Sequence, residues 1–392
     1  MRDVAIVGVG MTKFGRLSYE LDEMIAKACL AAMDDCGNPG IDSVYVANMG
    51  AGAINRQTAL ASAVIDRLGL LGKTSAVAIE NGPASGQNAA KLGFFEVASG
   101  YSDCVLVAGG ERMRVAPGGT ITDFVAMMSH PKAEYIHGVT LPSLAGMFAR
   151  LYMDKYGITS EDLANVAVKN HANGMLNPYA HIHQKIALEG ILLSREAKLN
   201  NPVIADPLRL YDMCPVSDGA AAFILCPLEK AKELCDTPVR IAGVGQGTDL
   251  HAVHERPDPL VLKSVQIAAD RAFAMAGVER KDIDFLELHD AFTILEFAES
   301  ENAGFFEPGK CATALREGVT QIGGKLPINP SGGLKARGHP VGATGAAQLV
   351  ECTWQLRGDA GRRQVSGAQR AFTVNFGGFG NNVVAHILER GD

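Results

Sequence analysis

The chain of 392 residues has no long apolar run, no basic run and no closely spaced pair of cysteines. Charge, glycine or proline interrupts every apolar stretch before the roughly 20 residues that a membrane span requires, so we expect no membrane segment. The net charge of −7 makes sequence-independent binding of nucleic acid unexpected. The eight cysteines show no CxxC spacing, which indicates reduced thiols in a cytoplasmic protein. Met1-Arg2-Asp3 leads directly into an apolar strand pattern, so no signal peptide is expected.

The chain does contain enough apolar material for a large core. Hydrophobic residues make up 47% and charged residues 20%, which is typical of a globular protein and excludes a disordered, coiled-coil or collagen-like chain. At roughly 150 residues per domain, the length predicts two or three units or two fused halves. Because the chain is acidic overall, an anionic ligand has to be bound by local Lys, Arg and helix N-termini.

Two segments of the chain are similar to each other. Val4 to Gly10 reads VAIVGVG, and Val239 to Gly245 reads VRIAGVG. After each segment we expect a helix, a strand, a helix start rich in small residues and a strand with glycine. These lie at 24–35, 44–48, 82–86 and 104–110 in the first half, and at 265–276, 285–288, 332–345 and 372–378 in the second. The repeat predicts two βαβαβ halves in an α/β fold, with buried and mostly parallel strands.

The segment from about residue 112 to residue 201 departs from this pattern. It contains several prolines, an amphipathic stretch near residues 144–156 and a loop rich in histidine. We interpret it as an insertion over the first half, and long insertions are usually lids or binding loops. The expected division is therefore 1–235, including the insertion, and 236–392.

Several motifs are weak. Gly8-Val9-Gly10 follows a strand, but the third glycine of a dinucleotide fingerprint would fall at Lys13, so turn glycines are favoured over NAD binding. Ser85 lacks the GxSxG context of a nucleophile, and a small residue needed for packing is favoured. Four histidines are candidate metal ligands by residue type, but they have no nearby cysteine or convincing third ligand, so no metal is expected: His181, His183, His251 and His254.

Two histidines have a more informative context. His339 lies between glycine and proline in the stretch Gly338–Gly345, at an expected helix start, where a neutral imidazole is favoured and can act as a base. His289, in Leu288–Phe292, follows a strand at the edge where open α/β sheets bind ligands. The alternatives are a capping or core histidine at 339 and a surface histidine beside a capping Asp290 at 289.

The chain resembles the thiolase superfamily, in its sterol-carrier/archaeal branch, over essentially its whole length. The matching stretches are 4–15, 80–86, 105–113, 214–222, 288–292, 326–345 and 375–380. The resemblance implies a duplicated five-layer α-β-α-β-α fold and a homodimer. It also implies coenzyme A as a substrate, with no permanently bound cofactor.

Two departures from the family pattern change the expected chemistry. Glu80–Gly86 places Pro83 where the family has its acyl-accepting cysteine, and Ala291 stands where this branch has its acid/base cysteine. The family's other cysteine location offers Asn375 and Gly377 but no thiol. Proline also lacks the N–H that helps form one oxyanion hole in the family, and a lost donor of that kind costs about 10²–10³ in rate.

By the resemblance, His289 and the amide of Gly377 or its neighbour hold a developing enolate, while His339 acts as the base. We therefore expect the thiol of coenzyme A to attack a β-keto acyl-CoA directly, without a covalent intermediate. The suggested substrate is 2-benzoylsuccinyl-CoA, cleaved to benzoyl-CoA and succinyl-CoA in anaerobic aromatic degradation. The alternatives are a retro-aldolase acting on a β-hydroxyacyl-CoA and a non-catalytic scaffold. The intact Gly-His-Pro favours the thiolase-type reaction.

The remaining expectations concern coenzyme A and partners. The candidate phosphate contacts are Arg112, Arg114, Lys335 and Arg337, with Ser331 and Gly332 nearby, although isolated basic residues are more often solvated surface. The resemblance implies a separate zinc-ribbon/OB-fold protein that helps to bind acyl-CoA, and an insertion that covers the pocket and reaches the dimer mate. Two alternatives follow for a distant thiol, such as Cys214 or Cys311: it folds into the site, or it lies elsewhere in the core.

Overall fold

The computed structural model describes residues 1–194 and 196–391, and its main feature is a nine-stranded sheet in the order β3-β2-β4-β7-β1-β8-β11-β10-β9. The first half contributes β1 (Val4–Met11), β2 (Ser43–Ala47), β3 (Ser75–Ile79), β4 (Val105–Glu111) and β7 (Gly219–Pro227). The second half contributes β8 (Val239–Thr248), β9 (Phe285–Glu287), β10 (Arg370–Gly377) and β11 (Asn382–Arg390). The two halves meet where β1 pairs with β8.

The strand order confirms the internal repeat. Read outward from the centre, the first half runs β1-β7-β4-β2-β3 and the second runs β8-β11-β10-β9. Beyond β9, Ile328 pairs in parallel with Leu286, at the place that β3 occupies in the first half. The predicted division between residues 235 and 236 falls between α8 (Leu228–Leu234) and β8, inside this continuous sheet.

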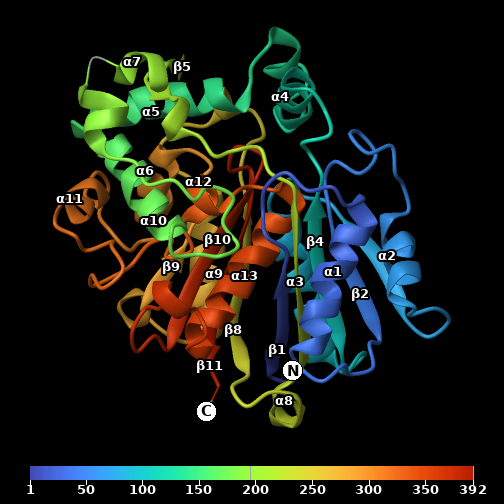
Figure 1. The fold of residues 1–392 in the computed structure, drawn as a ribbon. Coiled ribbons are helices and arrows are strands. Elements are labelled where there is room, and N and C mark those ends of the chain that lie inside the picture. The colour runs from blue at the N-terminus through green and yellow to red at the C-terminus, as the bar shows by residue number, and fades with distance from the viewer. Residues whose placement is uncertain (195, 392) are drawn as a thin grey trace.

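Helices cover the sheet in layers, which gives the expected five-layer α-β-α-β-α arrangement (Figure 1). On the outer side of the first half lie α1 (Leu21–Asp34) and α2 (Leu60–Leu68). Between the halves, α3 (Ser85–Ser99) packs against α13 (Thr344–Arg357), and both contact strands of the two halves. On the outer side of the second half lie α9 (Lys263–Ala276) and α10 (Thr293–Asn302). Three hydrophobic clusters fill the spaces between these layers.

The repeated GVG segments have a packing role. A Cβ at Gly10 would overlap the carbonyl oxygen of Ala28 in α1, and a Cβ at Gly245 would overlap that of Ala268 in α9. Glycine therefore allows each helix to lie directly on its strand. This close packing explains why both halves repeat the motif, and it agrees with the interpretation that Gly8 and Gly10 are not a dinucleotide fingerprint.

The expectation of mostly parallel strands was wrong. Within the nine-stranded sheet, three strand pairs are parallel, namely β2–β3, β2–β4 and β9–β10. The other five pairs of this sheet are antiparallel, namely β1–β7, β1–β8, β4–β7, β8–β11 and β10–β11. The difference comes from β7 and β11, two strands that the sequence pattern did not predict. Each of them pairs antiparallel with both of its neighbours.

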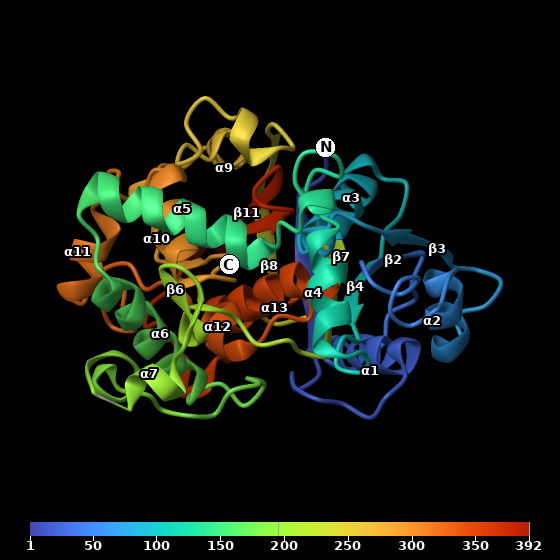
Figure 2. The same cartoon turned by 90° about the horizontal axis from the view of Figure 1, so that it is seen from above.

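The insertion forms a largely helical cover over one end of the sheet (Figure 2). Its main helices are α4 (Gly118–Ala126), α5 (Leu141–Tyr156) and α6 (Ser160–Gly174), followed by the short α7 (Ala197–Asn200). The hydroxyls of Thr140 and Thr159 cap α5 and α6 by accepting from backbone N–H groups, which fixes where these helices begin. A small hairpin of β5 (Val203–Ala205) and β6 (Leu208–Arg209) follows.

The remaining short helices are α11 (Cys311–Arg316) and α12 (Gly333–Arg337). In the part of the chain that the structure describes, no helix combines the length and the apolar character needed to cross a membrane.

Candidate active site

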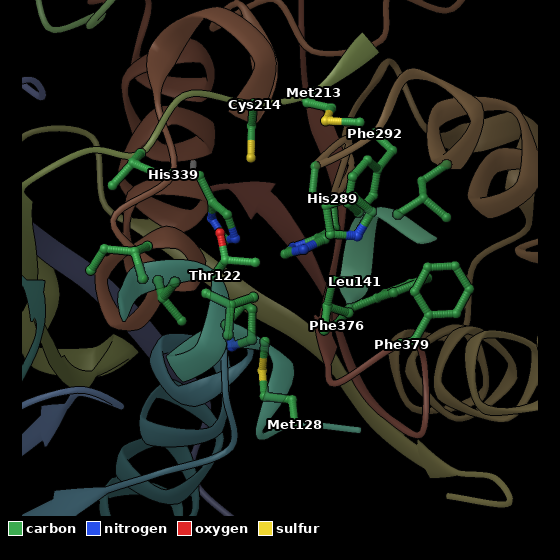
Figure 3. Close-up of a pocket in the computed structure, with 18 of the residues that line it drawn as sticks. Thr122, Met128, Leu141, Met213, Cys214, His289, Phe292, His339, Phe376 and Phe379 are labelled. Carbon is green, nitrogen blue, oxygen red and sulfur yellow. The ribbon is translucent and has the colours of Figure 1, made fainter. Parts of the chain in front are cut away.

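A cavity of about 240 Å³ lies at the carboxyl ends of three strands, where Met113 follows β4, His289 follows β9 and Gly378 follows β10. It is smaller than the about 300–1,000 Å³ of pockets for drug-sized ligands. Four of the predicted site residues line it, namely Pro83, Ala291, His289 and His339. Figure 3 shows the two histidines at the cavity. Most of the other lining side chains are apolar: Met113, Ile121, Val125, Met128, Leu141, Met213, Val216, Phe292, Leu295, Val341, Phe376 and Phe379.

The insertion supplies one wall of this cavity. Ile121, Thr122 and Val125 come from α4, and Leu141 and Pro142 come from the first turn of α5. The interpretation of residues 112–201 as a cover over the pocket therefore agrees with the structure. Its predicted contact with a dimer mate stays a prediction.

The hydrogen bonds of His339 define its tautomer. Thr344 Oγ1 lies 2.7 Å from His339 Nδ1 and 3.0 Å from the carbonyl oxygen of Pro340. Because the single hydroxyl proton of Thr344 is donated to that carbonyl, the hydroxyl oxygen accepts the Nδ1–H of His339. The lone pair is then left on Nε2. Burial and the nearby Arg337 lower the pKa of His339 to about 3, so the ring is neutral.

A buried carboxylate holds the loop that carries His339. Glu111, at the end of β4, accepts from the backbone N–H groups of Met49 (3.0 Å), Gly50 (2.9 Å) and Gly342 (3.0 Å). Burial raises the pKa of Glu111 to about 7, although these hydrogen bonds oppose the rise. Ser217 Oγ also accepts from the His339 N–H at 3.2 Å. The Gly338–Gly345 stretch is therefore fixed from both sides.

His289 lies at a right angle to His339. The ring centroids are 5.1 Å apart with an interplanar angle of 86°, and the His289 ring stacks on Phe376 at 5.4 Å and 5°. The backbone N–H of His289 donates to Glu299 Oε2 at 2.7 Å. Burial, together with His339 and Arg337, lowers the pKa of His289 well below its usual range, so this ring is also neutral.

The buried Nδ1 of His289 has no hydrogen-bond partner among the described residues. An unpaired buried N–H is more costly than an unpaired acceptor, so the favoured tautomer carries its proton on Nε2. The ring lines the cavity, and Figure 3 shows one of its nitrogens pointing into the space beside His339. The site thus presents an N–H donor from His289 and a lone pair from His339.

Asp290 joins the two histidine-bearing segments. Its carboxylate accepts from the backbone N–H of Leu334 at 2.6 Å and from Asn170 Nδ2 at 2.7 Å. It thereby ties the turn after β9 to α12, which directly precedes His339. The alternative of a surface histidine at position 289 was wrong, because His289 is buried. Its other part agrees with the structure, because Asp290 accepts from a backbone N–H in the first turn of α12.

Pro83 lies in the tight turn that precedes α3. Ser85 Oγ accepts from the Asn81 N–H at 2.8 Å and donates to the Gly82 carbonyl at 2.6 Å, which closes this turn and supports the packing interpretation of Ser85. The turn lies against the end of β10, because a Cβ at Gly82 would be 3.5 Å from the Gly378 nitrogen. Gly378 lines the cavity, and Gly377 lies just before it in the chain.

The structure does not place every candidate at the cavity surface. Asn375 is buried and donates to Gln348 at 2.6 Å. Arg337 is fully buried and pairs with Glu287 at 3.3 Å, and Ser331 donates to the same carboxylate at 2.8 Å. Gly332 packs on Gly174.

The assignment of Arg337 to coenzyme A phosphates is therefore corrected, because burial keeps its guanidinium from a phosphate at the surface. The same holds for Lys335, which is 3% exposed and whose pKa burial lowers to about 8. Ser331 and Gly332, expected nearby in the coenzyme A site, are buried as well. Arg114 is exposed, and Arg112 is partly buried beside Glu20. These two remain candidate phosphate contacts.

The histidines that the sequence offered as candidate metal ligands do not come together in one site. His181 Nδ1 lies 2.8 Å from Ser217 Oγ, and His183 Nε2 lies 2.8 Å from the carbonyl oxygen of Asn177. His251 Nε2 lies 3.1 Å from the carbonyl oxygen of Met128, and His254 is exposed. Over residues 1–194 and 196–391, no group of three or more His, Cys, Asp or Glu is arranged to hold a metal ion.

Three residues of the site were not assigned from the sequence. Thr344 and Glu111 act through His339 and its loop, and Cys214 lines the cavity itself. Thr344 lies five residues after His339 in the same motif, which is a signal that could have been used. Cys311, the other thiol considered, is buried in the cluster on the outer side of the second half.

The hydroxyl of Thr344 offers a direct test of the tautomer. With valine at position 344, Nδ1 loses its acceptor, so the proton is free to move to Nε2 and the lone pair that faces the cavity is lost. We expect Thr344→Val to lower the kcat/KM of the catalysed reaction about tenfold, the equivalent of one hydrogen bond of about 1.4 kcal/mol. Thr344→Ser keeps the hydroxyl and should retain most of the activity. Equal activity of the valine and serine variants would contradict the assigned tautomer.

The chain is similar to known proteins over nearly its whole length. Residues 4–229 match the family model "Thiolase, N-terminal domain", and residues 245–390 match "Thiolase C-terminal domain-like". An acetyl-CoA acetyltransferase of Methanothermobacter thermautotrophicus is 45% identical, with 100% of both chains covered. The benzoylsuccinyl-CoA thiolase subunit BbsB of Thauera aromatica is 34% identical, with 97% of this chain and 95% of the relative covered. A solved structure described as "Ltp2-ChsH2(DUF35) aldolase" has a TM-score of 0.83 and 25% identity, covering 99% of this chain and 97% of that one.

Proposed function

The chain belongs to the thiolase family, and from this premise we propose that it cleaves a β-keto acyl-CoA by direct attack of the coenzyme A thiol on the ketone. The observation that carries the proposal is the pair of neutral imidazoles facing one cavity beside Pro83. In this proposal the two imidazoles supply the acid–base and electrostatic half of a thiolase site. The positions where the family resemblance places its two cysteines hold Pro83 and Ala291.

Without a nucleophilic side chain at position 83, the acyl group has to pass directly from one carbon to the incoming sulfur. Both substrates must then be bound together, and holding them in reactive geometry supplies part of the rate that a covalent step would otherwise give. Because the cavity is only about 240 Å³, the proposal places in it the reacting acyl portion and the thiol end alone, with the rest of each coenzyme A outside. Arg114, exposed beside the lining residue Met113, is a candidate contact for its phosphates.

His339 is the proposed base, and its Nε2 takes the proton from the coenzyme A thiol. A histidine that is difficult to protonate is a weak base in the empty cavity. The transfer, however, creates a thiolate beside the imidazolium, and an opposite charge within about 4–6 Å favours the charged form of both groups. Proton transfer and attack on the ketone carbon then proceed together, so neither charge persists alone.

His289 is the proposed oxyanion donor. Its Nε2–H, with the amide of Gly377 or Gly378, is suited to hold the oxygen on which negative charge develops. Because both imidazoles are neutral, one can donate while the other accepts. The stacking on Phe376 orients the ring, and the hydrogen bond from the backbone N–H of His289 to Glu299 holds the segment that carries it, before substrate arrives.

The apolar lining of the cavity favours a substrate with an apolar or aromatic acyl group, and we propose 2-benzoylsuccinyl-CoA, cleaved to benzoyl-CoA and succinyl-CoA. The similarity to a relative named as a benzoylsuccinyl-CoA thiolase subunit supports this choice. The experiment is to incubate the purified chain with 2-benzoylsuccinyl-CoA, with and without free coenzyme A, and to follow the products by mass spectrometry. Coenzyme A-dependent formation of both products supports the proposal, whereas no turnover in either condition contradicts it.

A retro-aldolase acting on a β-hydroxyacyl-CoA is the second candidate, because a solved structure named as an aldolase has a TM-score of 0.83 to this chain. The two reactions differ in their need for coenzyme A. An aldolase cleaves without a thiol and releases a ketone or aldehyde, whereas thiolysis consumes one coenzyme A per cleavage. Turnover of a β-hydroxyacyl-CoA panel in the absence of coenzyme A would therefore favour the aldolase. Inactivity on both panels, with a partner present, would favour the scaffold interpretation.

We further propose a homodimer core and a separate zinc-ribbon/OB-fold partner. The edge strand β3 is largely exposed, with Val77 at 45% exposure, and Phe95 of α3 is 40% exposed. An open apolar edge of this kind is usually covered in native proteins. A partner is supported by the relative named as a subunit and by the two-component name of the similar aldolase structure. Light scattering of the purified chain, alone and mixed with a candidate partner, tests both proposals.

A further inference from the structure

The thiol of Cys214 points into the cavity that His289 and His339 line. Cys214 lies in the segment before β7, and its backbone N–H donates to the carbonyl oxygen of Ala291 at 3.0 Å. The preceding Met213 pairs with Phe292 in an antiparallel bridge. Figure 3 shows the Cys214 sulfur pointing toward the space shared by His339 and His289. The Cys214 segment therefore lies directly beside Ala291, the position where the family resemblance places an acid/base cysteine.

The cleavage needs a group that can protonate carbon. When the bond between the ketone carbon and Cα breaks, the electron pair remains on Cα as an enolate, and this carbon must gain a proton before the product leaves. Among the residues lining the cavity, four side chains carry a transferable proton: Thr122, Cys214, His289 and His339. His339 is engaged at the sulfur of coenzyme A, and His289 at the oxyanion. The Thr122 hydroxyl donates to the Gly118 carbonyl at 3.1 Å and is far too weak an acid.

We propose that the Cys214 thiol is the proton donor to Cα in the cleavage described above, and this inference rests on that proposed function. The coenzyme A S–H proton passes to His339 Nε2 as the new S–C bond forms at the ketone carbon. The C–Cα bond then breaks, its electron pair forms the enolate, and Cα takes the proton of Cys214. The Cys214 thiolate regains a proton from the His339 imidazolium. One thiol is consumed and one C–H bond is formed.

The surroundings of Cys214 suit a donor more than a nucleophile. Burial raises the pKa of its thiol to about 12, so the resting group keeps its proton. Asp290 adds to this rise, whereas the ammonium of Lys335 opposes it. Lys335 is buried and its charge acts on the thiol, so in the proposal it stabilises the thiolate while that exists. This gives the lysine a role in supporting the thiol in place of its earlier assignment to a phosphate.

The test uses the reverse of the donation step. An acyl-CoA product such as succinyl-CoA, incubated with the protein in D2O, exchanges its α-protons if a side chain removes and returns them. We expect Cys214→Ala and Cys214→Ser to slow this exchange at least 100-fold, within the about 10²–10⁴ that general acid–base groups contribute. The double variant Cys214→Ala/Ala291→Cys places a thiol on the neighbouring segment and should regain at least tenfold over Cys214→Ala. Cys235→Ala, far from the cavity, is the matched control and should exchange as the unmodified protein does.

The outcomes separate the thiol's role from the proposed function. Coenzyme A-dependent cleavage that persists in Cys214→Ala, with exchange within threefold of the unmodified protein, overturns the role of Cys214 and leaves the function standing. Exchange that depends on Cys214, in a protein that cleaves no β-keto acyl-CoA, supports the thiol and overturns the function. A protein that neither cleaves nor exchanges overturns both. Rescue by the double variant distinguishes a catalytic thiol from a side chain that only maintains the fold.

Discussion

Replacing His339 with alanine lowers the kcat/KM of coenzyme A-dependent cleavage by about 10³, within the usual contribution of a general base. The fall arises because no other group in the cavity offers a lone pair where the incoming thiol must lose its proton. Thr344 fixes the proton of His339 on Nδ1, so Nε2 is ready to accept. The measurement is steady-state cleavage of the proposed substrate, with the thermal midpoint of each variant recorded alongside. His254→Ala, at an exposed position, is the matched control and should be unchanged.

The pH profile gives the same prediction a second readout. Because its pKa is about 3 in the folded protein, His339 stays unprotonated across the neutral range. The kcat/KM of the unmodified protein should therefore show no fall near the ordinary histidine pKa of about 6.5. In His339→Ala, attack depends on thiolate already present, so kcat/KM should rise about tenfold per pH unit below the free-thiol pKa of about 8.5. Parallel profiles for the two proteins would show that His339 is not the base.

Replacing His289 with alanine should lower kcat by about 10²–10³, the cost of losing one oxyanion donor. The effect should appear mainly in kcat, because negative charge on the oxygen develops only as the reaction proceeds. His289→Gln keeps an N–H donor of similar reach and should recover part of the loss. A change confined to KM, with kcat within threefold of the unmodified protein, would indicate a binding role and would contradict the assignment.

The fold could be predicted from the sequence to the extent that local patterns determine it. Gly10 and Gly245 mark equivalent strands because a helix packs closely on each, and the glycines that this packing requires are visible in the local sequence. The direction of a strand in the sheet is not visible in the local sequence. The β7 segment is a buried apolar run like any other, and nothing in that run indicates that it pairs antiparallel with both β4 and β1.

The site shows the same division. His289 and His339 were found because each lies in a short distinctive motif. Burial of Arg337 and Lys335 could not be found, because a basic residue in a glycine-rich stretch has the same local pattern whether it faces solvent or pairs with Glu287. Cys214 lies 77 positions before Ala291 in the printed sequence, so only the three-dimensional fold brings the two together.

The central claim is that the coenzyme A thiol attacks the ketone with both substrates bound and no acyl-enzyme formed. Initial velocities measured over crossed concentrations of coenzyme A and the β-keto acyl-CoA test it most directly. The account predicts double-reciprocal lines that intersect, as a ternary complex requires. Parallel lines are the kinetic fingerprint of a covalent ping-pong route, and with an acyl adduct on any cysteine they would contradict the claim.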